Sequence, residues 1–165
     1  MSTRINVGRM DRRKRLSHMA IAVIILPWIG GAAETCPWLN AATAGGFLGG
    51  TTTVNVMHEN ANRDDAACAF TSATSELRIG VETMDPPHSQ YIKQAEQCGG
   101  DTMPLKAIGN EAVVCSPHPH TARVVGRVRN RIFTILINTS DPSTTADLLR
   151  EKARAIAEQV AGILF

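Results

Sequence analysis

The chain has 165 residues, of which 17 are Lys or Arg and 15 are Asp or Glu, so its formal net charge is +2. Six of the basic residues and one acidic residue lie in the first 33 positions, which leaves 11 basic and 14 acidic residues, a charge of about −3, in residues 34–165. The basic excess belongs to the N-terminal segment and gives no support for nucleic-acid binding. A hydrophobic content of 44% with 19% charged residues excludes a wholly disordered chain, and residues 34–165 suffice for one core but not for two domains.

Residues 1–33 have the order of a secretory signal peptide. A basic stretch over residues 11–15 precedes an apolar run and then small residues. Gly31 and Ala33 supply small side chains at a cleavage zone, which predicts cleavage before Glu34. A retained membrane anchor is the alternative, but the run is shorter than the roughly 20 apolar residues of a membrane span, and Pro27 interrupts it. Met10 is an alternative start of translation.

Cys36 follows the leader closely enough for lipid attachment to be considered. A bacterial lipid-attachment site has a small residue immediately before the cysteine and usually Leu three residues before it. This chain has Thr35 and Ala33 at those positions. We therefore expect residues 34–165 to be a single free exported domain, periplasmic, extracellular or associated with the cell envelope, with no stable membrane span after signal cleavage.

The exported part holds four cysteines, Cys36, Cys68, Cys98 and Cys115. An even number of cysteines in a small exported domain is typical of disulfides, because oxidising compartments retain them. Four cysteines permit three pairings, and the sequence alone does not choose among them. The pairing of nearest neighbours, Cys36–Cys68 and Cys98–Cys115, closes loops of moderate length and is the one we expect. A zinc site is the alternative, but the sequence has no close C-x-x-C pair.

The first half of the exported part predicts one helix and three strands. The helix is predicted over residues 37–48, with Pro37 in its first turn and Gly49-Gly50 at its end. The strands are predicted from β-branched or alternating apolar residues. They cover residues 51–57, 67–71 and 76–84.

The second half contains the longest predicted elements. A β-hairpin is predicted over residues 123–137, with Arg129-Asn130 as its turn and Asn130 placed to accept a positive φ. An amphipathic helix from about residue 143 to 164 has a single apolar stripe. Shorter elements are a helix over 89–97, an extended connector over 103–109 and a strand over 111–115. Together these elements predict an α+β fold, an antiparallel β-sheet with helices packed on one face and a long C-terminal amphipathic helix.

Three short motifs occur in a distinctive order. Cys-Pro-Trp-Leu begins at Cys36, a second cysteine, Cys68, lies in a strand, and Gly109-Asn110-Glu111-Ala112 precedes the last hairpin. With these motifs the chain resembles a family of small exported or lipid-anchored bacterial cell-envelope domains of unknown function, best known from actinobacteria. The resemblance implies a fold, an envelope location and a link between Cys36 and Cys68, but no activity. Cys98 and Cys115 are additional to the family's pattern, and the lipid-attachment motif is missing.

His118 and His120 are the best candidates for a metal site. If this segment is extended, both imidazoles project from one face and can share a cation. Exposed histidines in a Pro-rich loop are the alternative, because no acidic or cysteine residue is adjacent. The Gly-x-Ser-x-Gly motif of many hydrolases is absent from the sequence.

The hairpin carries a local basic cluster of Arg123, Arg127, Arg129 and Arg131. Strand alternation predicts that these odd-numbered residues lie largely on one face. One interpretation is a surface that contacts an anion or an acidic polymer. The other is a solvent-exposed face that keeps the hairpin soluble, and it predicts that loss of Arg127, Arg129 and Arg131 leaves the fold intact.

These observations predict a non-enzymatic exported envelope domain, a binding or structural module without a cofactor. Its partner is expected to be an unidentified envelope component rather than nucleic acid. A small secreted hydrolase and a periplasmic metal-binding protein that uses His118 and His120 are the alternative functions.

Overall fold

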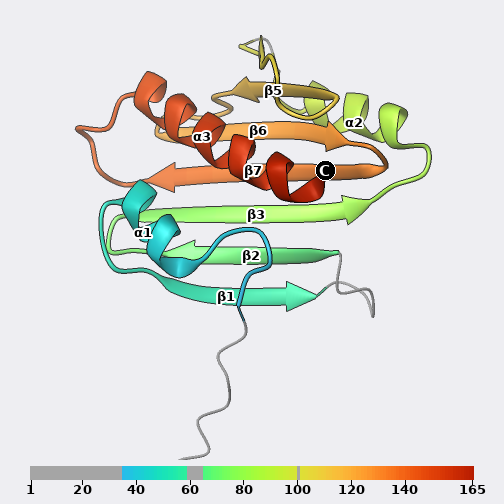
Figure 1. The fold of residues 1–165 in the computed structure, drawn as a ribbon. Helices are drawn as coiled ribbons and strands as arrows, with labels where there is room; N and C mark the ends of the chain where they lie inside the picture. The colour runs from blue at the N-terminus through green and yellow to red at the C-terminus, as the bar shows by residue number, and fades with distance from the viewer. Residues whose placement is uncertain (1–34, 59–64, 100) are drawn as a thin grey trace, which may run out of the picture. The chain divides into compact units, whose positions relative to one another are not determined.

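A seven-stranded antiparallel sheet with the strand order β1-β2-β3-β7-β6-β5-β4 forms the centre of the structure (Figure 1). The computed structural model describes residues 35–58, 65–99 and 101–165, so the predicted signal peptide lies outside the described residues. The predicted α+β class and antiparallel sheet are confirmed. In chain order the elements are α1 (Ala41–Leu48), β1 (Thr53–His58), β2 (Ala66–Thr71), β3 (Ser75–Thr83), α2 (Pro87–Glu96), β4 (Met103–Pro104), β5 (Glu111–Cys115), β6 (Thr121–Val128), β7 (Arg131–Thr139) and α3 (Ala146–Leu164).

Helix α1 begins at Ala41, later than the predicted Pro37, because Asn40 caps it. The Asn40 side chain accepts a hydrogen bond of 2.8 Å from the backbone N–H of Thr43, which satisfies one of the free donors of the first turn. At the other end Gly49 has a φ of 81°, a left-handed conformation that favours glycine. The predicted end of this helix is therefore confirmed, and its start is shifted.

Helices α1 and α3 cover one face of the sheet and bury the main core (Figure 1). Helix α3 begins after Thr145, whose side chain accepts a hydrogen bond of 3.3 Å from the Leu148 N–H. Its apolar stripe packs on β5, β6 and β7. The largest fully buried side chains of the strands beneath these helices include Phe70, Leu77, Ile79, Phe133, Ile135 and Ile137.

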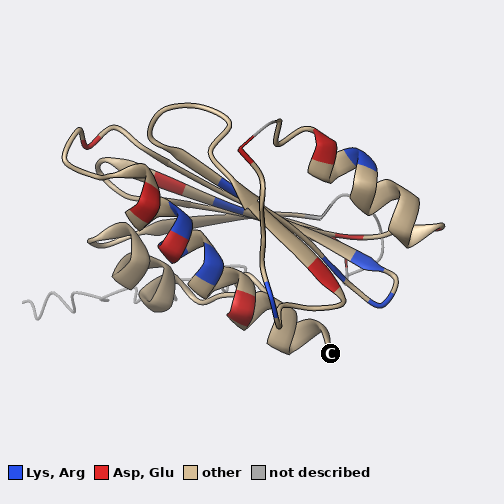
Figure 2. Cartoon of the chain, turned by 90° about the horizontal axis from the view of Figure 1, so that it is seen from above, with Lys and Arg blue, Asp and Glu red and all other residues tan. Residues whose placement is uncertain are grey.

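Helix α2 lies on the opposite face, which differs from the prediction that the helices pack on one face (Figure 2). Its contacts are mainly with β6 and β7. The apolar cluster beneath it consists of Tyr91, Cys98, Cys115, Val125 and Ile132. The adjacent residues Val124 and Val125 are both fully buried, because each lies under a different helix. On this second face, side chains of β1, β2 and β3 stay exposed or half-buried.

The hairpin turn between β6 and β7 places its positive φ on Arg129 rather than on the predicted Asn130. Arg129 has a φ of 56°. Its backbone N–H donates a hydrogen bond of 2.6 Å to Oδ1 of Asn110, and the N–H of Met84 donates one of 2.9 Å to the carbonyl oxygen of Asn130. Contacts from residues next to β3 and β5 therefore fix the conformation of this turn.

The structure contains two disulfides, Cys36–Cys68 and Cys98–Cys115, which are the nearest-neighbour pairs expected from the sequence. The first joins the segment before α1 to β2. The second joins the end of α2 to β5 beneath the second face. Among the described residues no cysteine is free.

Candidate functional site

The second face of the sheet is organised in rows of side chains that cross the strands. Residues directly opposite each other in an antiparallel ladder share a face, so the strand register gives the members of each row. The arginine row consists of Arg123, Leu136, Arg78, Ala69 and Asn55. The small-residue row beside it consists of Val125, Thr134, Gly80, Ala67 and Met57.

Arg123 begins the arginine row and is partly buried beside the end of α2. Both of its terminal nitrogens donate to Oε1 of Gln97, each at 3.1 Å. Its Nε atom is buried without a hydrogen-bond partner, and no Asp or Glu of the described residues forms an ion pair with it. Burial lowers the pKa of this guanidinium. The charge of Arg123 is therefore partly desolvated and has no counter-charge in the part of the chain that the structure describes.

A hollow of about 510 Å³ lies beside Arg123 and contains no acidic residue in its lining. The lining residues are Gln97, Pro117, His118, Thr121, Arg123, Thr134, Leu136 and Asn138. Arg78, in the same row, differs from Arg123 because it is exposed and pairs with Glu76 at 2.7 Å. Small-molecule sites typically have volumes of about 300–1,000 Å³ and a few polar groups that orient the ligand. The size and the positive charge of this hollow suit a small anionic group.

Hydrogen bonds to amides hold the hydroxyl groups around this hollow. Thr121 Oγ1 donates to Oδ1 of Asn138 at 3.0 Å, and Thr134 Oγ1 donates to Oε1 of Gln94 at 3.0 Å. A hydroxyl that acts as a nucleophile is normally bonded to a general base. These two hydroxyls are bonded to neutral amides rather than to a general base.

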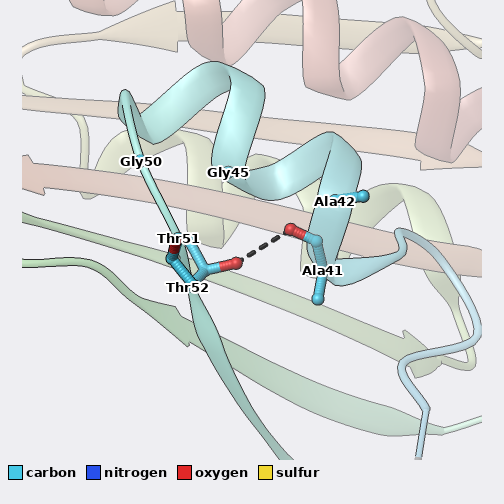
Figure 3. Close-up of a pocket in the computed structure, with 6 residues that line it drawn as sticks. All are labelled: Ala41, Ala42, Gly45, Gly50, Thr51 and Thr52. Atoms are coloured by element: carbon cyan, nitrogen blue, oxygen red, sulfur yellow. Dashed lines mark hydrogen bonds between the residues drawn. The ribbon is translucent and has the colours of Figure 1, made fainter.

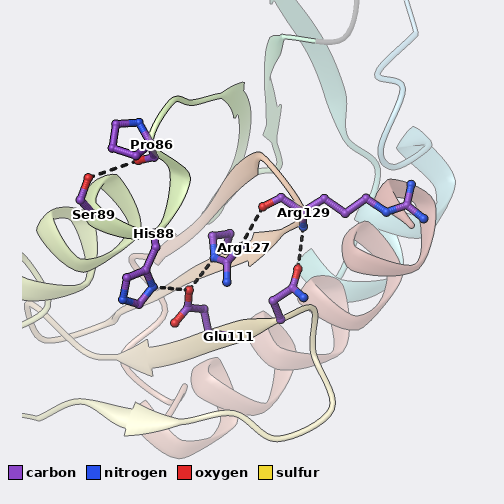
Figure 4. A network of polar contacts seen from close by, with 7 residues as sticks. Pro86, His88, Ser89, Glu111, Arg127 and Arg129 are labelled. Carbon is purple, nitrogen blue, oxygen red and sulfur yellow. Dashed lines mark hydrogen bonds and ion pairs between the residues drawn. The ribbon is translucent and has the colours of Figure 1, made fainter.

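Arg127 takes part in a polar network beside α2 instead of lying on a free solvent face (Figure 4). Its Nε donates to Oε1 of Glu111 at 2.5 Å, and His88 Nδ1 lies 2.8 Å from the same oxygen. The side chains of Arg127 and Glu111 are only 20% and 25% exposed. Burial acts to raise the pKa of Glu111, but hydrogen bonds with His88 and Arg127 lower it below its ordinary value.

The four arginines of the hairpin do not share one face, in contrast to the prediction. The two-residue turn pairs Val128 with Arg131 and Arg127 with Ile132, so odd-numbered residues of β6 lie opposite even-numbered residues of β7. Arg131 therefore shares the face of Val128, which belongs to the main core on the α3 side. Arg123 and Arg127 lie on the α2 side, and Arg129 is exposed in the turn.

His118 and His120 lie in a turn between β5 and β6 rather than in an extended segment. His120 has a φ of 58°, and its carbonyl oxygen accepts a hydrogen bond of 3.0 Å from Thr139. The extended geometry that would align the two imidazoles is not present here. His118 lines the hollow beside Arg123, whereas His120 is outside its lining. Within the described ranges, no three His, Cys, Asp or Glu side chains gather as ligands for a metal ion.

A separate hollow beside α1 has a lining without charged side chains (Figure 3). Its lining residues are Ala41, Ala42, Gly45, Gly50, Thr51 and Thr52. Thr52 Oγ1 donates a hydrogen bond of 2.8 Å to the Ala41 carbonyl oxygen. A Cβ atom at Gly45 would lie 2.5 Å from the Gly50 carbonyl oxygen, so glycine is needed for this close approach. These residues pack the start of β1 against α1.

No family model, curated protein or solved structure matches the chain. The resemblance to actinobacterial envelope domains therefore stays a prediction.

The sequence analysis identified Arg123 as a candidate but missed its neighbours Gln97, Thr134 and Leu136. A signal was present in the paired apolar residues Val124-Val125 and Ile132-Phe133, since a strand with both faces covered has adjacent apolar residues. That pattern indicates a second helix-covered face, and it places Arg123 beside Val125 under that cover.

Proposed function

We propose that residues 34–165 are a non-enzymatic exported module that binds an anionic group of an envelope component in the hollow beside Arg123. The observation that carries the proposal is the state of the guanidinium, which is partly buried, bonded to a neutral amide and unpaired with any acid of the described residues. A desolvated charge without a counter-charge costs free energy. A bound carboxylate or phosphate offsets this cost.

The geometry around Arg123 leaves donors for such a ligand. A guanidinium has five N–H groups, and two of those of Arg123 are used by Gln97. Each terminal nitrogen keeps a second N–H that can bind a ligand oxygen, and the positive charge of the donor makes such a hydrogen bond stronger than one between neutral groups. His118 and Asn138 add hydrogen-bonding capacity to the same lining.

Export is supported by the two disulfides, which are stable in oxidising compartments and rare in reducing ones. No helix among the described residues combines the length and the apolar character needed to cross a membrane. We infer that the domain acts in the periplasm, outside the cell or at the cell envelope. An unidentified envelope component that carries carboxylate or phosphate groups is then the partner.

Binding is favoured over catalysis because the hydroxyls near Arg123 donate to the amides of Asn138 and Gln94. No specific observation favours the alternatives of a hydrolase or of a metal site at His118 and His120.

A titration of the oxidised protein, isolated from a bacterial periplasm, with acetate and with inorganic phosphate tests the proposal. We expect a saturable shift of the ¹H–¹⁵N signal of Arg123 Nε with at least one anion. Anion affinity should be lost in Arg123→Gln and kept in Arg154→Gln, which removes an exposed arginine of α3. Equal affinity in all three proteins, or no shift with either anion, would contradict the proposal.

A further inference from the structure

A shallow apolar trough continues from the Arg123 hollow across the open part of the second face. It has a volume of about 210 Å³, and its lining includes Met57, Ala67, Ala69, Gly80, Thr134 and Leu136. Arg78, which is exposed and pairs with Glu76, is the one charged residue of this lining. Thr134 and Leu136 also line the Arg123 hollow, so the two hollows are contiguous. A partly buried cation therefore lies at one end of an apolar path.

The small-residue row provides the floor of this trough. A Cβ atom at Gly80 would have no atom within 4 Å, so the space above Gly80 is open. Ala67 lies next to Gly80 in the row, and Met57, which is 51% exposed, ends the row on β1. From β6 to β1 the path crosses four interstrand steps, a distance of roughly 19 Å at about 4.8 Å per step.

The trough suits a hydrocarbon chain better than a peptide. The hydroxyl of Thr134 already donates a hydrogen bond to Gln94. Gly80 and Ala67, which lie between Thr134 and Met57 in the small-residue row, have no side-chain group that can form hydrogen bonds. A peptide laid here would find a donor only in Arg78, so most of its backbone N–H and C=O groups would lack partners in the trough. The volume of the trough is also below the typical range of about 300–1,000 Å³ for compact ligands, which favours a thin chain.

We propose that the ligand is a single-chain anionic amphiphile, a long-chain fatty carboxylate. Its carboxylate binds Arg123, and its aliphatic chain lies along the trough past Leu136 and Gly80 toward Met57. This inference rests on the proposed anion site and adds the chemical class of the group attached to the anion. The positive charge of Arg123 favours the carboxylate of this ligand, and the small-residue row favours its aliphatic chain.

Affinity should then increase with chain length, because each methylene that enters the trough is removed from water. Full burial of a methylene contributes about 0.8 kcal/mol, close to a fourfold gain in affinity. The trough is open on one side, so we expect about two- to fourfold for each methylene. Dodecanoate should bind at least about tenfold more tightly than octanoate.

The test is calorimetric titration of the oxidised exported protein with octanoate, dodecanoate and dodecyltrimethylammonium, all below their micelle concentrations. Gly80→Val fills the trough at a position with free space and high tolerance for β-branched residues. It should abolish the advantage of dodecanoate and leave the affinity for octanoate within about twofold. Gly162→Val, at an open position on α3, is the matched control and should bind like the natural chain. Ala67→Leu fills the same trough if Gly80→Val does not fold.

Three results would overturn the inference. If octanoate and dodecanoate bind with equal affinity and neither binds Arg123→Gln, the anion site is supported but the trough does not bind the aliphatic chain. Failure of every carboxylate to bind would contradict the proposed function as well. A dimer in sedimentation that Gly80→Val converts to monomer, without any effect of chain length on affinity, would make this face an interface between copies of the chain.

Discussion

Both terminal nitrogens of Arg123 donate hydrogen bonds to a single amide oxygen, Oε1 of Gln97, at the C-terminal end of α2. The acceptor is neutral, although a carboxylate of nearly the same shape would supply a counter-charge at that position. This choice of acceptor leaves the charge of Arg123 available to a ligand.

Gln97→Glu should therefore stabilise the fold and weaken ligand binding. The new carboxylate would add an ion pair to the hydrogen bonds that Arg123 now donates to a neutral acceptor. Gln94→Glu adds the same charge one turn earlier on α2, where its partner is the hydroxyl of Thr134, so it is the control. The free energy of unfolding, measured in urea, should be about 1 kcal/mol higher for Gln97→Glu than for Gln94→Glu.

Gln97→Glu should also lower the affinity for octanoate at least tenfold, because the new carboxylate of residue 97 competes with octanoate for Arg123. Unchanged affinity in Gln97→Glu would mean that octanoate does not bind at the guanidinium.

Loss of Arg127 should destabilise the fold, in contrast to the solvent-face interpretation of the sequence. Arg127→Gln removes a half-buried ion pair with Glu111 and a hydrogen bond to the carbonyl oxygen of Arg129. We expect a loss of about 1.5–3 kcal/mol in urea unfolding, since hydrogen bonds to charged groups contribute about that much. Arg154→Gln, which breaks an exposed pair with Glu158, should cost less than about 0.5 kcal/mol. Equal losses in the two variants would restore the solvent-face interpretation for Arg127.

Glu111 should also make stability depend on acid pH. Its folded-state pKa is below the ordinary value of 4.5, so its contribution is fully present above about pH 4.5. That contribution is lost as the pH falls through the lowered pKa of the folded state. Glu111→Gln should flatten the fall of unfolding free energy over this range, and Glu158→Gln should not. Parallel pH curves for the natural chain and Glu111→Gln would contradict this role.

Arg129→Gly should stabilise the hairpin turn. Arg129 has a φ of 56°, which is unfavourable for residues with a Cβ atom but not for glycine. Its hydrogen bond to Asn110 comes from the backbone and is kept in the variant. We expect a gain of up to about 1 kcal/mol in thermal or urea unfolding, and a loss for the β-branched Arg129→Val. A loss with glycine would mean that the exposed side chain contributes more than the backbone conformation costs.

Removal of either disulfide should destabilise the fold, and slightly more for the disulfide that closes the longer loop. The bridges link residues 17 and 32 positions apart. The chain-entropy relation gives about 3 kcal/mol for the Cys98–Cys115 loop and about 0.5 kcal/mol more for Cys36–Cys68. Paired Cys→Ser variants in urea unfolding measure these losses, and non-reducing peptide mapping checks the pairing. Four reactive thiols in the exported protein would contradict both disulfides.

The elements set by local chemistry could be predicted from the sequence. Alternation identified the strand around Ile79, and the apolar stripe identified α3. The even number of cysteines predicted disulfides, and the nearest-neighbour pairing, one of three possible, is confirmed. Helix starts were less accurate because Asn40 and Thr145 cap the helices inside the predicted segments.

The position of the site could not be predicted in the same way, because it depends on long-range register. Arg123 lies opposite Leu136 in the pairing of β6 with β7, and Gly80 lies opposite Thr134 in the pairing of β3 with β7. The site therefore combines residues of several strands. Whether α2 packs above or below the sheet decides whether Arg123 meets Gln97. The apolar pattern of α2 does not determine which face of the sheet the helix covers.

A crystal structure of the oxidised protein with dodecanoate tests the central claim most directly. We expect a carboxylate oxygen within hydrogen-bond distance of the Arg123 guanidinium and the aliphatic chain over Gly80, pointing toward Met57. Dodecanoate bound at another place, or a carboxylate that leaves Arg123 bonded only to Gln97, would contradict the claim that this hollow is the ligand site.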